Sequence, residues 1–279
     1  MKSEPKLVAL IRHIRIAVCL AAAALAMASP GLASPAVAPH SAVYRLTLSD
    51  SSDLMGVAAA NGRIDFKWIE GCDGWTVDQR TYLVLTNRQG QDVESGWVLN
   101  AWESKDGLSY RFSLRRAYAN GSPEETRGKA RLEGPGLGGV VTFSEPVQDP
   151  IVLPAGTVFP TRYTEELLEA GARGEVTFWR YLFDGASEES FFGVNAAISR
   201  AIPAEAAPSF DSPLTRGQAS WRMRLAYFGG DRQASEPDHE QTQRLYASGI
   251  VDDLTFEYDD FVLEASLERL EALSPPVCP

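Results

Sequence analysis

Apolar and polar residues alternate along most of the chain from Val43 onward. Between residues 109 and 115, Tyr110, Phe112 and Leu114 are separated by serine and arginine residues, and the same alternation recurs over 221–227. Successive side chains of a β-strand point to opposite faces, so this pattern predicts strands with one face in water. By this criterion we expect strands over 43–49, 62–70, 74–86, 91–103, 109–115, 125–132, 138–144, 175–183, 190–199, 221–227, 243–250, 252–259 and 260–270.

Short segments typical of turns separate these strands. Glycine tolerates the backbone conformations that tight turns need, and asparagine and aspartate favour turns as well. The glycine-rich segment 134–139 is interpreted as a hairpin turn, because it lacks the lysine and hydroxyl residues that follow in a phosphate-binding loop. So many strands joined by short polar turns predict a mainly β protein with a large antiparallel meander. The predicted turns are Asn61-Gly62, Gly71 to Gly74, Gln89-Gly90, Asp106-Gly107, Asn120-Gly121, Asp184-Gly185 and Gly229-Gly230.

One segment has the spacing of a helix. After the sequence LPAGTVFPT, the residues Tyr163, Leu167 and Leu168 recur at helical intervals, and Gly171 lies near the end of the segment. We predict one helix over 161–171, capped by Thr161, that lies across a curved sheet and plugs or lines its concave face. The segments 201–219 and 231–241 are expected to be irregular, the second of them acidic and polar.

The first 33 residues have the pattern of a secretory signal. Four basic residues precede an uncharged apolar run from Ile16 to Met27, which is too short for a membrane-spanning helix. Small residues favour cleavage after Ala33, with Ala28 as the alternative site, and a retained anchor helix is the alternative for the whole segment. Cys19 lies inside the apolar run and is interpreted as an ordinary apolar residue, not as a site of lipid attachment. We therefore expect export to the periplasm and a single processed domain over 34–279.

The charge of the chain disfavours nucleic acid as a partner. The full sequence has a net charge of −11, and removing the signal discards four basic residues and one acidic residue, which leaves −14. Such a chain repels phosphate backbones, and no run of basic residues is present to offset this. No segment after Met27 has the length and hydropathy of a transmembrane span.

Two cysteines remain after processing, Cys72 and Cys278. An even number of cysteines is expected where disulfides persist, and a free thiol at the second-last residue would be a liability in an oxidising compartment. A metal site or a redox pair is the competing interpretation, but no CxxC is present and no histidine neighbours either cysteine. We predict a disulfide that pins the C-terminus to the turn at Gly71 to Gly74.

No catalytic constellation stands out. His40 is expected in a frayed N-terminus and His239 in a polar loop, and no GxSxG segment is present to deliver a serine nucleophile. A metal site around His239 lacks a second histidine, so we expect neither a metal nor a cofactor. The acidic pairs Asp252-Asp253, Asp259-Asp260 and Glu188-Glu189 keep an envelope-glycan hydrolase as the alternative function. Acidic pairs are expected by chance in so acidic a chain, and the first and second of these fit strand ends and solvent-exposed faces.

Aromatic residues are the remaining signal. All six tryptophans lie after the signal segment, and most fall in predicted strands, where their first role is in the core. The sharper interpretation is that a curved sheet directs some of them into a groove for an acyl chain or an apolar peptide segment. The candidate surface comprises Trp97, Trp179, Trp221, Tyr163 and Leu167.

Several segments together resemble the cell-envelope integrity B family of α-proteobacterial periplasmic proteins. They are AVYRLTL near the processed N-terminus, WTVDQR after Cys72, LPAGTVFPT, FDG at 183–185, WRMRLAYF and the ending VDDLTFEYDDFVLEASLERLE before Cys278. The resemblance covers essentially the whole processed chain. It implies a broad β-spiral or open barrel-like sheet with one helix packed on it, similar to periplasmic carriers and sensors of lipoproteins. It also implies a disulfide between the positions of Cys72 and Cys278 and a role in envelope integrity, and it carries no catalytic residues.

These observations lead to one main hypothesis. The protein is expected to be a non-enzymatic periplasmic protein that binds a partner protein, a lipoprotein or a lipid on a concave β surface. The ligand, the partner and the oligomeric state are not specified by the sequence, nor is whether the concave face is a filled core or an open groove.

Overall fold

The computed structural model describes residues 36–51, 56–118, 121–186, 191–229 and 235–278. The predicted signal segment, 1–33, lies outside the described residues, as does the acidic pair Glu188-Glu189. The described residues form one continuous sheet and one helix, α2 (Pro160–Ala172). The strands are β1 (His40–Ser51), β2 (Val57–Glu70), β3 (Gly74–Asn87), β4 (Asp92–Ser104), β5 (Ser109–Tyr118), β6 (Glu124–Leu132), β7 (Gly139–Glu145), β8 (Ile151–Leu153), β9 (Thr157–Val158), β10 (Thr177–Leu182), β11 (Phe192–Ile198), β12 (Ser220–Phe228), β13 (His239–Tyr246), β14 (Val251–Glu257) and β15 (Phe261–Ala272).

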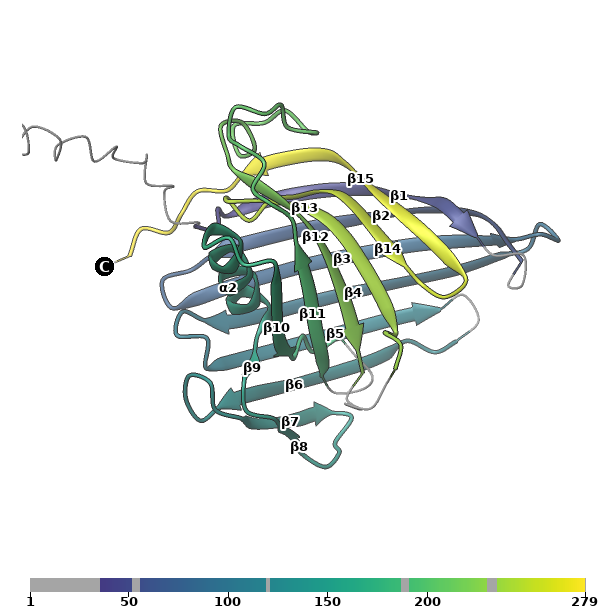
Figure 1. Ribbon diagram of the computed structural model, residues 1–279. Helices are drawn as coiled ribbons and strands as arrows, with labels where there is room; N and C mark the ends of the chain where they lie inside the picture. Colours follow the sequence, from purple (N-terminus) through teal and green to yellow (C-terminus); the bar gives the residue numbers. More distant parts are fainter. Residues whose placement is uncertain (1–35, 52–55, 119–120, 187–190, 230–234, 279) are drawn as a thin grey trace, which may run out of the picture. The chain divides into compact units, whose positions relative to one another are not determined.

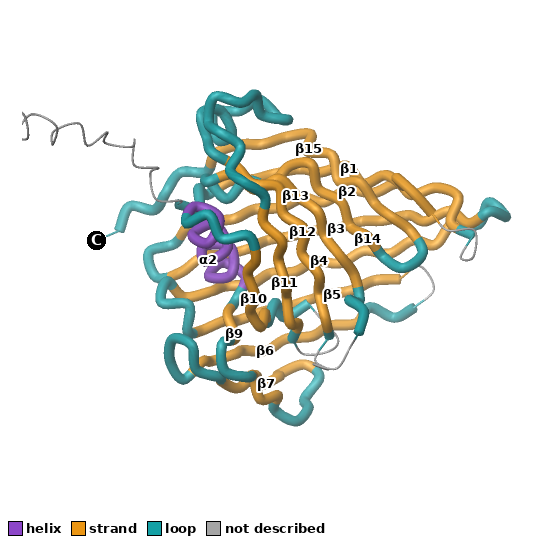
Figure 2. The backbone as a smooth tube through the Cα atoms, in the orientation of Figure 1, coloured by secondary structure: helices purple, strands orange, loops and turns teal. Residues whose placement is uncertain are grey.

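The sheet consists of two meanders joined through the first and last strands. Its order is β8-β7-β6-β5-β4-β3-β2-β1-β15-β14-β13-β12-β11-β10-β9, antiparallel except for the β9–β10 pair. The two edge strands, β8 and β9, are consecutive in the chain and are separated only by residues 154–156. The sheet therefore curls until its edges meet at this short linker, which gives a nearly closed, barrel-like architecture. Figure 1 shows strands β11–β14 crossing in front of β2–β5, and Figure 2 shows the same path as a tube.

The alternation pattern located the long strands well, and the exceptions have physical reasons. Strands β8 and β9 were not predicted, since two or three residues carry no periodicity. The predicted turn at Asn61-Gly62 is wrong, because both residues lie inside β2 and pair with β1 and β3. Gly62 is instead a close-approach position, where an added Cβ would lie 2.5 Å from the carbonyl oxygen of Tyr82.

Helix α2 confirms the predicted helix, but not its predicted cap. The helix begins at Pro160, a favoured first residue because proline needs no backbone hydrogen-bond partner there. Phe159 occupies the N-cap position and its side chain makes no capping bond, so the expectation that Thr161 caps the helix is wrong. Phe159 is fully buried among aromatic rings, including Tyr110 at a centroid distance of 5.1 Å. Core packing therefore determines the residue at this position.

The inner face of α2 packs on the second meander. Leu167 and Leu168 are each 1% exposed and belong to a core cluster with side chains of β10–β13. Gly171 allows the helix to approach Trp221 of β12 closely, because an added Cβ at this position would lie 3.1 Å from the Trp221 ring. The helix thus fills one part of the sheet's interior, as the sequence pattern predicted.

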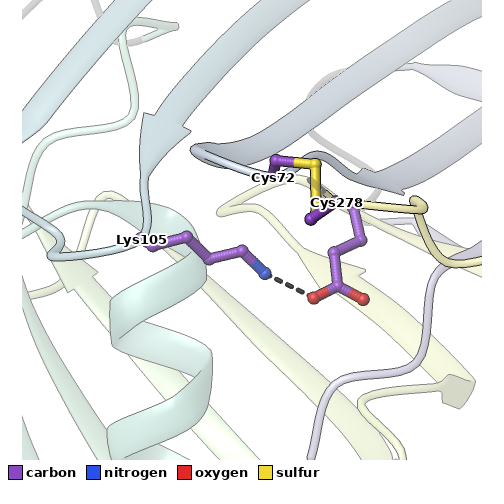
Figure 3. Close-up of a disulfide and its surroundings, with 4 residues drawn as sticks. Cys72, Lys105 and Cys278 are labelled. Atoms are coloured by element: carbon purple, nitrogen blue, oxygen red, sulfur yellow. Dashed lines mark hydrogen bonds and ion pairs between the residues drawn. A yellow bond between two sulfur atoms is a disulfide. The ribbon is translucent and has the colours of Figure 1, made fainter.

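The disulfide joins Cys72, in the β2–β3 turn, to Cys278, with a Cα–Cα distance of 5.6 Å and a sequence separation of 206 residues (Figure 3). Lys105 lies beside it in the β4–β5 turn. Its backbone N–H donates to the carbonyl of Asp73, and its ammonium group lies 2.5 Å from a carboxylate oxygen of Glu70. The same ammonium group lies 4.2 Å from the centre of the Trp75 ring. The disulfide and these contacts tie the C-terminus to two adjacent hairpin turns.

Both described histidines are more ordered than the sequence suggested. His40 is not frayed: it begins β1, is 2% exposed, and contacts the rings of Phe66 and Trp68. His239 is not in a loop but begins β13. The pairing of β1 with both β15 and β2 accounts for the order at His40. Among the described residues, no helix is long and apolar enough to cross a membrane.

Candidate ligand-binding cavity

The concave face of the sheet encloses a cavity of about 360 Å³. This volume lies in the range of roughly 300–1,000 Å³ typical of small-molecule sites. Both meanders and the helix line it, mostly with apolar and aromatic side chains. The lining residues are Phe66, Trp68, Trp75, Val77, Gln79, Trp97, Leu99, Ala101, Glu103, Tyr110, Pro160, Thr161, Tyr163, Thr164, Leu167, Leu182, Asp184, Ala186, Leu225, Tyr227, Gln241, Gln243, Leu245, Gly249 and Val251. The concave face therefore holds an open cavity beside the packed core.

Period-two alternation of the strands delivers these side chains. On β4, Trp97, Leu99, Ala101 and Glu103 all line the cavity, and the residues between them do not. On β13 the same holds for Gln241, Gln243 and Leu245. Every second residue of a strand lies on one face, so the alternation that predicted the strands also produces the cavity wall.

The structure brings together three of the five residues expected on a ligand surface. Trp97, Tyr163 and Leu167 line the cavity. Trp179 lies on the face of β10 opposite to that of the cavity-lining Leu182, is 44% exposed, and packs over Gly193. Trp221 is 1% exposed in the core beneath α2 and is not among the residues that line the cavity.

Glu103 connects the cavity to the helix. Its side chain is 3% exposed, and its two carboxylate oxygens accept hydrogen bonds from the backbone N–H groups of Thr161, at 2.7 Å, and Arg162, at 2.9 Å. Thr161 and Arg162 are the second and third residues of α2. The backbone N–H groups at these positions normally donate to an N-cap side chain. Burial raises the pKa of Glu103 to about 7, although the two N–H groups act in the opposite direction. Glu103, a strand residue that lines the cavity, thus caps the helix.

Stacked aromatic rings run from the cavity to the surface. The ring of Tyr227, which lines the cavity, lies 4.4 Å from that of His239 with an interplanar angle of 11°. His239 in turn lies 5.8 Å from the ring of Tyr258, which is 41% exposed. Burial lowers the pKa of His239, which favours the neutral imidazole. The stack connects a residue of the cavity lining to an exposed aromatic ring.

The two acidic pairs that the structure describes, Asp252-Asp253 and Asp259-Asp260, do not line this cavity. Asp252 is buried, not on a solvent face as expected, and accepts a hydrogen bond from the Tyr246 hydroxyl at 2.7 Å. Asp253 accepts from Ser209 and Arg222. Neither this pair nor Asp259-Asp260 is among the lining residues. Across the described ranges, no group of three or more histidine, cysteine, aspartate or glutamate residues is arranged to hold a metal ion.

Comparison with known proteins places the chain in a family. A family model described as EipB-like matches residues 32–274. The chain belongs to the EipB-like family. It is 29% identical over 273 residues to the cell envelope integrity protein EipB of Brucella abortus (strain 2308), covering 94% of this chain and 95% of that protein. The crystal structure of a beta-barrel-like protein of a domain of unknown function from Brucella abortus matches with a TM-score of 0.76 and 25% identity, covering 86% of this chain and 99% of that one. These EipB-like relatives confirm the family resemblance and the barrel-like fold.

The sequence did not single out several of the residues that line the cavity. Glu103 was not singled out, because it sits in a regular strand pattern and its partners are almost sixty residues away. The strand pattern assigns Trp68 and Trp75 to the core, and Gln241 of β13 lies before residue 243, the predicted start of that strand. The one sequence signal for Glu103 is that an acidic residue occupies an inward position on a strand face that is otherwise apolar.

Proposed function

We propose that this protein is exported to the periplasm and maintains cell-envelope integrity without catalysing a reaction, by holding an apolar segment of a lipid or lipoprotein in its interior cavity. The observation that carries the proposal is the cavity of about 360 Å³, lined by both meanders and by α2. The relative from Brucella abortus is named a cell envelope integrity protein, which supports the envelope role.

The chemistry of the lining supports a hydrocarbon ligand. Leu99, Leu167, Leu225 and Val251 present aliphatic groups from four different elements, and three tryptophans add broad apolar surface. Burying a hydrocarbon chain against such surface is favourable by about 25 cal/mol per Å² of apolar area. An apolar segment of a partner protein is the competing occupant of the same surface.

The test uses two neighbouring residues of β4 that alternate between the faces. Leu99→Trp places bulk in the cavity, whereas Val98→Trp places the same bulk on the other face of the strand. A strain that lacks this gene is challenged with a detergent and complemented with each variant. We expect Val98→Trp to restore growth and Leu99→Trp to fail, with both proteins folded and present at equal levels. Full rescue by Leu99→Trp would contradict the proposal.

Crosslinking distinguishes a bound partner protein from a bound lipid. If a partner protein is held on this surface, a stable protein adduct is expected with the wild type and lost with Leu99→Trp. Copurified acyl species without a protein adduct support the lipid form of the proposal.

A further inference from the structure

The charge of the cavity limits what it can bind. The charged residues in the described lining are Glu103 and Asp184, and no lysine, arginine or histidine is among them. The remaining polar groups belong to uncharged glutamine, threonine, tyrosine and tryptophan side chains. A buried anion is stable only where a cation or several donors compensate it. A carboxylate or phosphate group inside this cavity would meet two acids and no cation.

Two of the residues that line the cavity carry buried donors that need an acceptor. The indole Nε1 of Trp68 and the hydroxyl of Tyr163 are buried and have no hydrogen-bond partner among the described residues. The two side chains are 6% and 4% exposed, come from β2 and α2, and both line the cavity. An indole N–H can only donate, and a phenol hydroxyl donates readily, so both lack an acceptor oxygen. Buried polar groups without partners are uncommon in native proteins and call for an explanation.

Two other unpartnered atoms provide a comparison. Trp221 Nε1 and Asp252 Oδ1 are also buried without a partner in the described part of the chain. Neither residue lines the cavity. Trp221 therefore offers an equivalent indole N–H that a cavity ligand does not reach.

We propose that the cavity selects one acyl chain carried on an uncharged ester or amide, whose carbonyl oxygen accepts hydrogen bonds from Trp68 or Tyr163, and that it rejects the fatty-acid anion. This inference rests on the proposed function and names the ligand class of the same site. Ester and amide carbonyls are uncharged acceptors, so they satisfy the donors without placing an anion beside Glu103 and Asp184. The ester corresponds to an acyl chain on glycerol, as in a glycerolipid or in the diacylglyceryl group of a lipoprotein, and the amide corresponds to the N-acyl chain of a lipoprotein.

The test compares three ligands with an identical saturated chain: the fatty acid, its methyl ester and its N-methyl amide. Each displaces an uncharged fluorescent dye, Nile red, from the purified oxidised protein at about pH 8, where a fatty acid is ionised. We expect the ester, the amide or both to bind at least about tenfold more tightly than the anion, as an unpaired buried charge requires. Tighter binding of the amide identifies the N-acyl chain of a lipoprotein, and tighter binding of the ester identifies a chain esterified to glycerol. Equal or tighter binding of the anion would overturn the inference and leave the proposed function intact.

Conservative variants identify which side chain donates to the carbonyl oxygen of the ligand. Trp68→Phe and Tyr163→Phe remove one donor each and keep an aromatic ring. At least one of them is expected to narrow the preference for the uncharged ligands several-fold, whereas Trp221→Phe leaves the preference unchanged. An unchanged preference in both cavity variants would overturn the role of the donors. If dye and all three ligands fail to bind the wild type, the proposed function itself fails.

Discussion

Glu103 on β4 caps the helix that begins 57 residues later, with its carboxylate 2.7 Å from the backbone nitrogen of Thr161. The same side chain lines the cavity. The start of α2, the floor of the cavity and the inner face of β4 are therefore one connected structure. Any change at Glu103 is expected to affect the helix as well as the cavity.

Glu103→Ala should free the N-terminus of α2. Two backbone N–H groups lose their acceptor in a buried place, so we expect the free energy of unfolding to fall by about 2 to 4 kcal/mol. Urea denaturation measures the loss, and amide hydrogen exchange at Thr161 and Arg162 should accelerate. Glu94→Ala, at an exposed position of the same strand, is the control and should change little. Unchanged exchange at Thr161 would contradict the capping role.

The raised pKa of Glu103 also predicts a pH dependence. Its pKa is about 7 in the folded protein against an ordinary value of 4.5. The folded state thus holds the proton more tightly, and this contribution to stability is complete below pH 4.5 and is lost as the pH rises through 7. Relative to Glu103→Gln, the wild type should lose on the order of 3 kcal/mol across this window. Parallel urea titrations of the two proteins test this, and identical pH slopes would count against it.

Removing the disulfide should loosen the domain. The bond spans 206 residues, for which chain entropy gives about 5 kcal/mol as an upper figure. Cys72→Ser or Cys278→Ser is therefore expected to lower the melting temperature by several degrees at least. Differential scanning calorimetry compares each variant with the oxidised wild type, and reduced wild type serves as the control. Equal melting of variant and oxidised wild type would refute a stabilising role.

Gly62→Ala distinguishes the observed strand from the turn that the sequence suggested. The new Cβ would lie 2.5 Å from the Tyr82 carbonyl oxygen, so the two strands must separate locally. We expect a loss of about 1 to 3 kcal/mol, the usual range for overpacking. Gly96→Ala is the matched comparison, since its Cβ would lie at 3.3 Å from a backbone oxygen. Thermal unfolding should rank Gly62→Ala as clearly the less stable; the reverse order would argue against this register.

The long strands were predictable because alternation is a local property of the sequence. Tyr110, Phe112 and Leu114 occupy the inward positions of β5 that their spacing indicated, and all three are at most 5% exposed. Local patterns could not reveal β8 and β9, whose two or three residues are held in place by neighbouring strands. They also could not show that the sheet's two edges meet at residues 154–156.

The candidate site was only partly predictable, for a related reason. Trp97, Tyr163 and Leu167 line the cavity, while the equally apolar Trp221 is used to seat the helix against Gly171. Sequence indicates which face of a strand is apolar, but curvature determines which part of that face is covered by α2. The cap at Glu103 depends on the same tertiary placement, and so does the stacking of His239 between Tyr227 and Tyr258.

In the cell, the cavity is expected to hold an acyl chain. The most direct measurement is native mass spectrometry of the protein released gently from the envelope, for wild type, Leu99→Trp and Val98→Trp. We expect an acyl-bearing adduct on the wild type and on Val98→Trp, and its loss from Leu99→Trp. A wild-type protein that carries neither lipid nor acylated peptide would contradict it.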